Sequence, residues 1–87
     1  MKVFFFMGRN PKNRSGVSWK IWKVVRHKRS VTTHWGPAVL RGRKPVPASY
    51  MQSKTRRFKT AFEAITHEKQ LVEAKLKKGY ERRPRWR

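Results

Sequence analysis

Hydrophobic and polar positions follow the two-residue period of β-strands along the first part of the chain. Val3 to Met7 is an uninterrupted apolar run of the length expected for a buried strand. From Val17 to Val24 apolar residues occupy both parities, which places Trp19 and Trp22 on opposite sides of a strand. A bulge and a strand covered on both sides each explain this switch. Val31 to Trp35 alternates again and predicts a third strand, hairpinned to the second.

Proline, glycine and polar clusters mark the segments between these strands. Residues 9–16 predict a basic loop, and residues 27–30 predict a short turn. Gly36-Pro37 is expected to end the third strand, because proline cannot donate to the ladder. Residues 41–47 are expected to form an extended loop, because each proline restricts its predecessor. Residues 50–58 predict a further strand, in which the even-numbered residues share one side.

The pattern changes to the period of an α-helix after residue 60. Thr60 and Glu63 have the spacing of a capping box, so a helix is predicted over 61–78. Gly79 is placed as the left-handed residue that ends it. Glu68 and Lys75 interrupt the predicted apolar side near one edge. That side is formed by Ala61, Phe62, Ala64, Ile65, Leu71, Val72 and Leu76.

These elements predict an α+β fold, a small antiparallel sheet of about four strands with one C-terminal helix packed across it. We expect one domain over residues 1–80 and a mobile basic tail over 81–87. A chain of 87 residues forms one modest core, and four Trp, five Phe and two Tyr supply its aromatic surface. The expected core residues are Phe4, Phe6, Trp19, Ile65 and Val72.

Positive charge is concentrated in the first two thirds of the chain. The net charge is +20, and the first 59 residues hold 16 of the 24 Lys and Arg but none of the four acids. Crowding of like charges destabilises a compact state unless a partner of opposite charge is present. A polyanionic partner is therefore expected, and nucleic acid is the first candidate.

Several classes of function lack their residues in this chain. There is no cysteine, and the three histidines have no metal-ligand spacing, so neither a metal nor another cofactor is expected. The four glutamates provide no convincing pair for acid-base catalysis, and we expect no enzyme and no small-molecule substrate. No apolar run approaches the ~20 residues that span a bilayer, so no membrane partner is expected either. The absence of cysteine leaves the compartment undecided but fits a cytoplasmic protein, with the nucleoid as one location.

One strand and the end of the helix resemble a known domain. Residues 31–36 read Val-Thr-Thr-His-Trp-Gly, and residues 75–80 read Lys-Leu-Lys-Lys-Gly-Tyr. Between them, residues 52–55 read Gln-Ser-Lys-Thr. In this order the segments resemble the WGR domain, and the resemblance covers residues 3–80. Small bacterial proteins that contain little besides this domain are similar to the chain in length and arrangement.

The resemblance implies an antiparallel sheet crossed by one helix, and a DNA-binding role. In poly(ADP-ribose) polymerases the strand tryptophan of this domain lies against the sugar of a terminal nucleotide near a strand break. Trp35 matches that position and is the first candidate for DNA contact. Two interpretations stay open: Trp35 stacks on a sugar or base, which is worth ~1–3 kcal/mol, or it packs in the core.

The chain departs from the family pattern around the motif. Pro37 replaces the name-giving arginine, His34 stands where an arginine is common, and residues 38–50 form a longer segment. Cations from this segment and from the next strand are expected to contact phosphate, and solvated side chains with no binding role are the alternative for both. The candidate nucleic-acid-binding residues are Trp35, His34, Arg41, Arg43, Lys44, Lys54, Arg56 and Arg57.

The prediction is thus a non-enzymatic nucleic-acid-binding module, with DNA favoured over RNA and strand ends or breaks as one target. The alternatives are an RNA- or ribosome-associated basic protein and an adaptor that binds an acidic protein. The arginines of the tail wrap nucleic acid or form only a polar tail. These arginines are Arg82, Arg83, Arg85 and Arg87.

Overall fold

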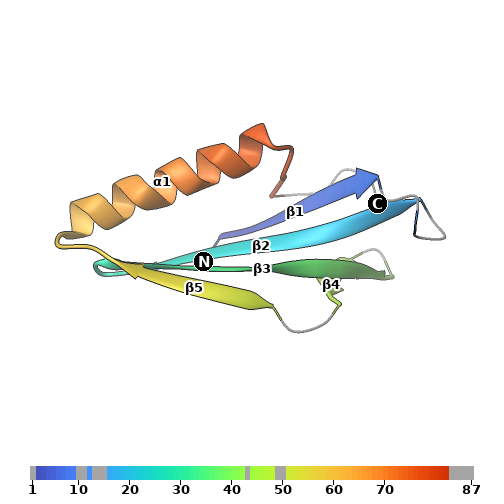
Figure 1. Cartoon of the computed structure of the whole chain (residues 1–87), viewed down its shortest axis with the longest axis horizontal. Helices are drawn as coiled ribbons and strands as arrows, with labels where there is room; N and C mark the ends of the chain where they lie inside the picture. The colour runs from blue at the N-terminus through green and yellow to red at the C-terminus, as the bar shows by residue number, and fades with distance from the viewer. Residues whose placement is uncertain (1, 10–11, 13–15, 43, 49–50, 83–87) are drawn as a thin grey trace.

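The chain forms a five-stranded antiparallel sheet with one helix packed on one side, which confirms the predicted α+β fold (Figure 1). The computed structural model describes residues 2–9, 12, 16–42, 44–48 and 51–82. In order, the elements are β1 (Lys2–Arg9), β2 (Val17–His27), β3 (Ser30–Arg41), β4 (Lys44–Pro47), β5 (Gln52–Arg57) and α1 (Ala61–Lys77).

β3 organises the sheet because it pairs with three other strands. The order β1-β2-β3-β4 follows the sequence, and β5 pairs with the part of β3 that β4 leaves free. β5 takes residues 30–35 of β3 as partners, and β4 takes residues 38–41. The two short strands therefore share one edge of β3, while β2 pairs with residues 30–38 along the other edge.

β2 is covered on both sides and contains no bulge over residues 19–24. Its register with β1 and with β3 is continuous there, which excludes the bulge that the sequence left open. Trp22 and Val24 are buried on the side of α1, and Ile21 is buried on the opposite side. Trp19 and Trp22 point to different sides, as predicted.

β3 does not end at Gly36-Pro37, so that prediction was wrong. The strand continues to Arg41, and Pro37 pairs with Lys20 of β2. The Pro37 carbonyl faces away from β2 and accepts a hydrogen bond of 3.0 Å from the Ala48 amide. Because the nitrogen and oxygen of a strand residue point to the same side, the missing N–H of Pro37 costs the β2–β3 ladder no hydrogen bond.

The predicted loop over residues 41–47 was also wrong, because residues 44–47 form strand β4. A turn at Gly42, with φ +62°, joins β4 to β3. β4 is an edge strand, and its prolines, Pro45 and Pro47, alternate with residues whose backbone faces β3. Proline is tolerated at such edge positions because its nitrogen points away from the ladder. The segment that is longer than in the WGR pattern therefore extends the sheet.

The two ends of α1 carry the predicted signals. The Glu63 amide donates to the Thr60 side chain at 3.1 Å, so Thr60 is the N-cap. At the other end Gly79 has φ +102°, and the amides of Gly79 and Tyr80 donate to the carbonyls of Leu76 and Lys75. This pair of bonds is the Schellman arrangement that closes a helix.

The side of α1 that faces the sheet is rotated from the predicted one. Phe62 and Leu76, both expected in the apolar side, are 76% and 50% exposed. Glu68 instead reaches the sheet, where its carboxylate lies 3.5 Å from Arg26, and Lys75 lies over the Trp22 ring. Ala64 is the residue of α1 that is fully buried. The side of α1 that contacts the sheet thus includes Glu68 and Lys75, which the sequence analysis placed near the edge of the apolar side.

The core lies between α1 and the middle of the sheet. Its buried residues are Phe4, Trp22, Val24, Val31 and Ala64. Of the other expected core residues, Val72 packs against this cluster, while Phe6, Trp19 and Ile65 are partly buried. Glu81 exchanges two backbone hydrogen bonds of 2.8 Å with Phe5 and so adds to the outer edge of β1. Within the described residues, no helix has the length and apolarity to cross a membrane.

Candidate nucleic-acid interface

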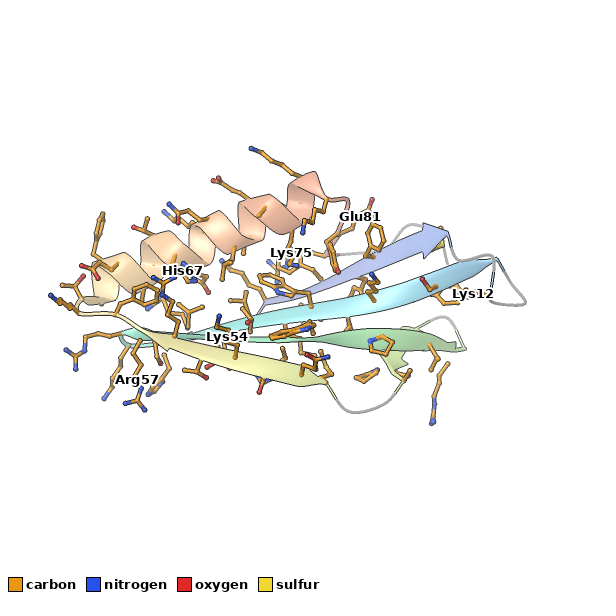
Figure 2. All side chains as sticks on the ribbon, in the orientation of Figure 1. Lys12, Lys54, Arg57, His67, Lys75 and Glu81 are labelled. Carbon is orange, nitrogen blue, oxygen red and sulfur yellow. The ribbon has the colours of Figure 1, made fainter. Side chains whose placement is uncertain are left out.

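Alternate residues of β2, β3 and β5 form a groove beside α1. Trp35 pairs with Trp22 on β2 and with Gln52 on β5, so these side chains share the side of the sheet that carries α1. The same alternation places Lys54 and Arg56 of β5 on that side. In Figure 2 the side chains of Lys54, His67 and Lys75 lie between the helix and the sheet.

The groove consists of two adjoining hollows that share Trp35 and Lys75. The larger has a volume of about 360 Å³ and runs between α1 and β5. The second, of about 300 Å³, continues past the C-terminal end of the helix. Besides the two shared residues, the first hollow is lined by Trp22, Val31, Thr33, Lys54, Arg56, His67 and Leu71. The second is lined by Lys20, Ile21, Gly36, Pro37, Gln52 and Tyr80.

Trp35 takes part in both the core and the groove. Its side chain is half-buried and packs against the core cluster. It also lines both hollows, so part of its ring is open to a ligand. The two interpretations of the sequence are therefore not exclusive, because one part of the indole packs inward and another is accessible.

Cations reach the groove from three elements. Lys20 comes from β2, Lys54 and Arg56 come from β5, and Lys75 comes from α1. Lys20, Lys54 and Arg56 are exposed, and Lys75 is half-buried. No glutamate lines either hollow. A flexible positive charge at each wall and an aromatic ring between them is an arrangement that can hold a phosphate-linked sugar or base.

Lys75 is the most constrained of these cations. Its Nζ lies 5.5 Å from the centroid of the Trp22 ring and 5.2 Å from the centroid of the Tyr80 ring. Burial lowers the pKa of its amine below the ordinary value, and the positive charges of Lys78 and Lys20 lower it further. An anion bound in the groove would relieve the repulsion among these three lysines.

The other end of the groove holds a cluster of aromatic and basic groups. The Arg56 guanidinium lies 5.2 Å from the centroid of the Phe58 ring, which lies 5.0 Å from the centroid of the His67 ring. Burial lowers the pKa of the His67 imidazole, and the charge of Arg56 adds to this effect. The imidazole is therefore held neutral at a pH where an ordinary histidine begins to protonate.

The structure brings together three of the eight predicted site residues, namely Trp35, Lys54 and Arg56. His34 and Arg57 point to the opposite side of the sheet, because each stands one position away from a groove residue. The exposed Arg41 has the parity of Trp35 but lies six strand positions further on, about 20 Å along β3.

The remaining two predicted site residues are Arg43 and Lys44. Arg43 lies outside the described residues. Lys44 begins β4 opposite Arg41, and its side chain is also outside what the structure describes. The cations that line the groove with Trp35 therefore come from β2, β5 and α1 rather than from Arg41.

Sequence reasoning missed Lys75, Lys20 and His67 as groove residues. One signal for Lys75 was present in the sequence. Lys75 follows Leu71 by four positions, and residues four apart lie on the same side of a helix, so Lys75 faces the sheet together with Leu71. For Lys20 the signal was its parity with Trp22, which places it on the side of α1. His67 can be recognised as a groove residue only when the position of β5 beside β3 is known.

Comparison with protein-family models, with curated proteins and with solved structures gave no match. A relationship to the WGR domain is therefore a proposal that rests on the sequence segments 31–36, 52–55 and 75–80.

Proposed function

We propose that this chain is a non-enzymatic nucleic-acid-binding module related to the WGR domain, with DNA as its preferred partner. The observation that carries the proposal is the groove beside α1, where the accessible part of Trp35 is flanked by Lys20, Lys54, Arg56 and Lys75 and by no glutamate. Trp35 stacks on a sugar or base at a strand end or break. The lysines and the arginine contact the adjoining phosphates.

Two further features support this role. The sequence carries a net charge of +20, which destabilises a small compact domain through self-repulsion and fits a polyanionic partner. In addition, repulsion among Lys20, Lys75 and Lys78 at one end of the groove is relieved when an anion binds there. Both features favour a partner with closely spaced negative charges, which is the property of a nucleic-acid backbone.

Salt-dependent binding by a variant of two exposed groove cations tests the proposal. Lys54→Gln with Arg56→Gln removes two cations from an exposed strand, so the core is left in place. The slope of log affinity against log salt on a nicked DNA duplex is expected to fall by about 2, since each phosphate contact contributes about 1. The matched control, Lys69→Gln with Lys77→Gln, removes equal charge from exposed positions of α1. Equal changes of slope in both double variants would contradict a role for the groove.

Trp35 is tested separately, because part of its ring packs in the core. Trp35→Ala is expected to reduce binding to nicked or blunt-ended DNA more than binding to closed circular DNA. Unfolding in urea shows whether the variant is still folded, and Trp35→Phe keeps a ring for stacking. An equal loss on ended and closed DNA by a folded Trp35→Ala would overturn the stacking role. Competition between matched DNA and RNA duplexes measures the preference for DNA.

A further inference from the structure

A second basic surface lies on the side of the sheet that α1 does not cover. It consists of three rows, each made of one residue from β2, one from β3 and one from β5 that are partners in the register. The first row joins Lys23, His34 and Ser53. Because partners in a register point to the same side, each row forms a line of neighbouring side chains across the sheet.

The second row joins Val25, Thr32 and Thr55. The two threonine hydroxyls are hydrogen-bonded at 2.8 Å, which fixes both side chains against each other across the strands. Val25 is the one apolar residue of the three rows. The middle row therefore presents three small side chains, of which the two threonines are polar.

The third row joins His27, Ser30 and Arg57, next to the turn between β2 and β3. Lys28 and Arg29 form that turn, and together with the third row they border a shallow hollow of about 240 Å³. We call the three rows the basic plate. None of its nine side chains is buried, and none of the four glutamates belongs to it.

The basic plate faces away from the groove. β5 alternates between the two surfaces, since Lys54 and Arg56 line the groove while Arg57 belongs to the plate. Figure 2 shows Lys54 on the side of the helix and Arg57 pointing away from it. The sheet itself thus separates two sets of cations that a single rigid ligand cannot touch together.

We propose that the basic plate binds the phosphate backbone of a second nucleic-acid segment, so that one molecule holds two segments on opposite sides of its sheet. This inference rests on the proposed function of the groove. Lys, Arg, Ser and Thr side chains make most contacts to phosphate oxygens, and the plate is built largely of these residues. A duplex bends little over a few tens of base pairs, so the same stretch of duplex does not reach both surfaces.

The composition of the plate argues against a second copy of the chain as its occupant. Two plates placed face to face would bring Lys23 and Arg57 of one copy close to the basic residues of the other. Val25 alone would contribute apolar surface to such an interface. Like charges opposed in this way cost free energy, and the plate offers little hydrophobic burial to offset it.

The number of duplexes bound per chain tests the inference. The probe is a 12-base-pair blunt duplex, about 41 Å long, which matches the 46 Å length of the molecule. Native mass spectrometry with excess duplex counts both components of each complex. The wild type is expected to bind two duplexes per chain. A plate variant, Lys23→Gln with Arg57→Gln, is expected to bind one, and the groove variant Lys54→Gln with Arg56→Gln is also expected to bind one.

Each outcome separates the plate from the groove. A wild type that saturates at one duplex, or a plate variant that still binds two, would overturn the inference. If the groove variant bound two duplexes while the plate variant bound one, the groove function would fail instead. A wild type that binds no duplex would overturn both. Unfolding in urea checks that both double variants are as stable as the wild type.

Discussion

At the scale of single residues, the charge of the Lys75 amine is subject to opposing interactions. Its contacts with the rings of Trp22 and Tyr80 favour the charged ammonium, while burial and the charges of Lys78 and Lys20 disfavour it. A residue in this position is sensitive to any anion that enters the groove. Lys75 thus links the aromatic core to the surface that we propose for nucleic acid.

His67 makes stability depend on pH. Its pKa in the folded state lies below the ordinary value of 6.5 because of burial and the charge of Arg56, so the folded chain binds this proton less readily than the unfolded chain. The free energy of unfolding is expected to fall as the pH drops through 6.5, and this contribution is fully retained above it. Urea unfolding at a series of pH values measures the slope. His67→Gln, which cannot titrate, should have a shallower slope, and an unchanged slope would exclude His67 as the cause.

Lys28 carries backbone strain that a substitution can remove. Among the described non-glycine residues it alone has a positive φ, +55°, in the turn between β2 and β3. Lys28→Gly is expected to stabilise the fold by about 0.5–1 kcal/mol, because glycine adopts this conformation without a steric penalty. Lys28→Ala removes the same charge but keeps the strain, so it separates the two effects. Thermal unfolding of both variants decides, and the prediction fails if Lys28→Ala stabilises as much as Lys28→Gly.

At the scale of elements, the docking of α1 depends on few contacts. Ala64 is buried against the sheet, Glu68 pairs with Arg26, and Lys75 lies over Trp22. Leu71 and Val72 are partly buried and pack against the core cluster, and the hydrogen bonds at the helix ends add to this small set of side-chain contacts. Both ends are closed by specific hydrogen bonds, to Thr60 at the start and around Gly79 at the finish.

The N-cap of α1 is therefore expected to matter for the whole fold. Thr60→Ala removes the hydrogen bond from the Glu63 amide and should cost about 1 kcal/mol. For a domain of this size the melting temperature would fall by about 4–8 °C. Thr60→Ser keeps the hydroxyl and serves as the matched control. Circular dichroism during heating measures both variants, and equal melting temperatures for Thr60→Ala and the wild type would refute the capping role.

The elements also show what local sequence does and does not predict. The N-cap, the glycine end of α1 and the opposed tryptophans of β2 were predicted because each depends on residues within a few positions. The continuation of β3 through Gly36-Pro37 was missed. Proline fits in a strand only where its nitrogen faces away from a hydrogen-bonding partner, and the sequence alone does not show which way the nitrogen faces. Trp35, Lys54 and Arg56, which line the groove, were among the candidate residues named from the sequence. Lys75 and His67 were not, because their place depends on how the helix is rotated.

At the scale of the whole molecule, the distribution of charge sets the two surfaces apart. Three of the four glutamates belong to α1, and the five strands contain none. Basic residues therefore face solvent on both sides of the sheet, in the groove and on the basic plate. This distribution agrees with the proposal that nucleic acid approaches from two sides.

Salt is expected to affect stability and binding in opposite directions. Screening reduces the repulsion within a chain of net charge +20, so the melting temperature should rise between low salt and about 0.15 M, where the Debye length is about 8 Å. Affinity for DNA should fall over the same range. Replacing the exposed Lys69 and Lys77 by glutamate lowers the net charge and should weaken the response of the melting temperature. A melting temperature independent of salt would contradict strong self-repulsion.

The pairing of Phe5 with Glu81 has a consequence for the chain as it is synthesised. These partners stand 76 positions apart, and the helix that packs over β2 and β3 is also made late. At about 5–20 residues per second, the ribosome needs about 4–15 seconds to add the residues between them. During that time the outer edge of β1 lacks the two hydrogen bonds that Phe5 makes with Glu81. Newly made chains are therefore expected to aggregate more readily before Glu81 is added than after it.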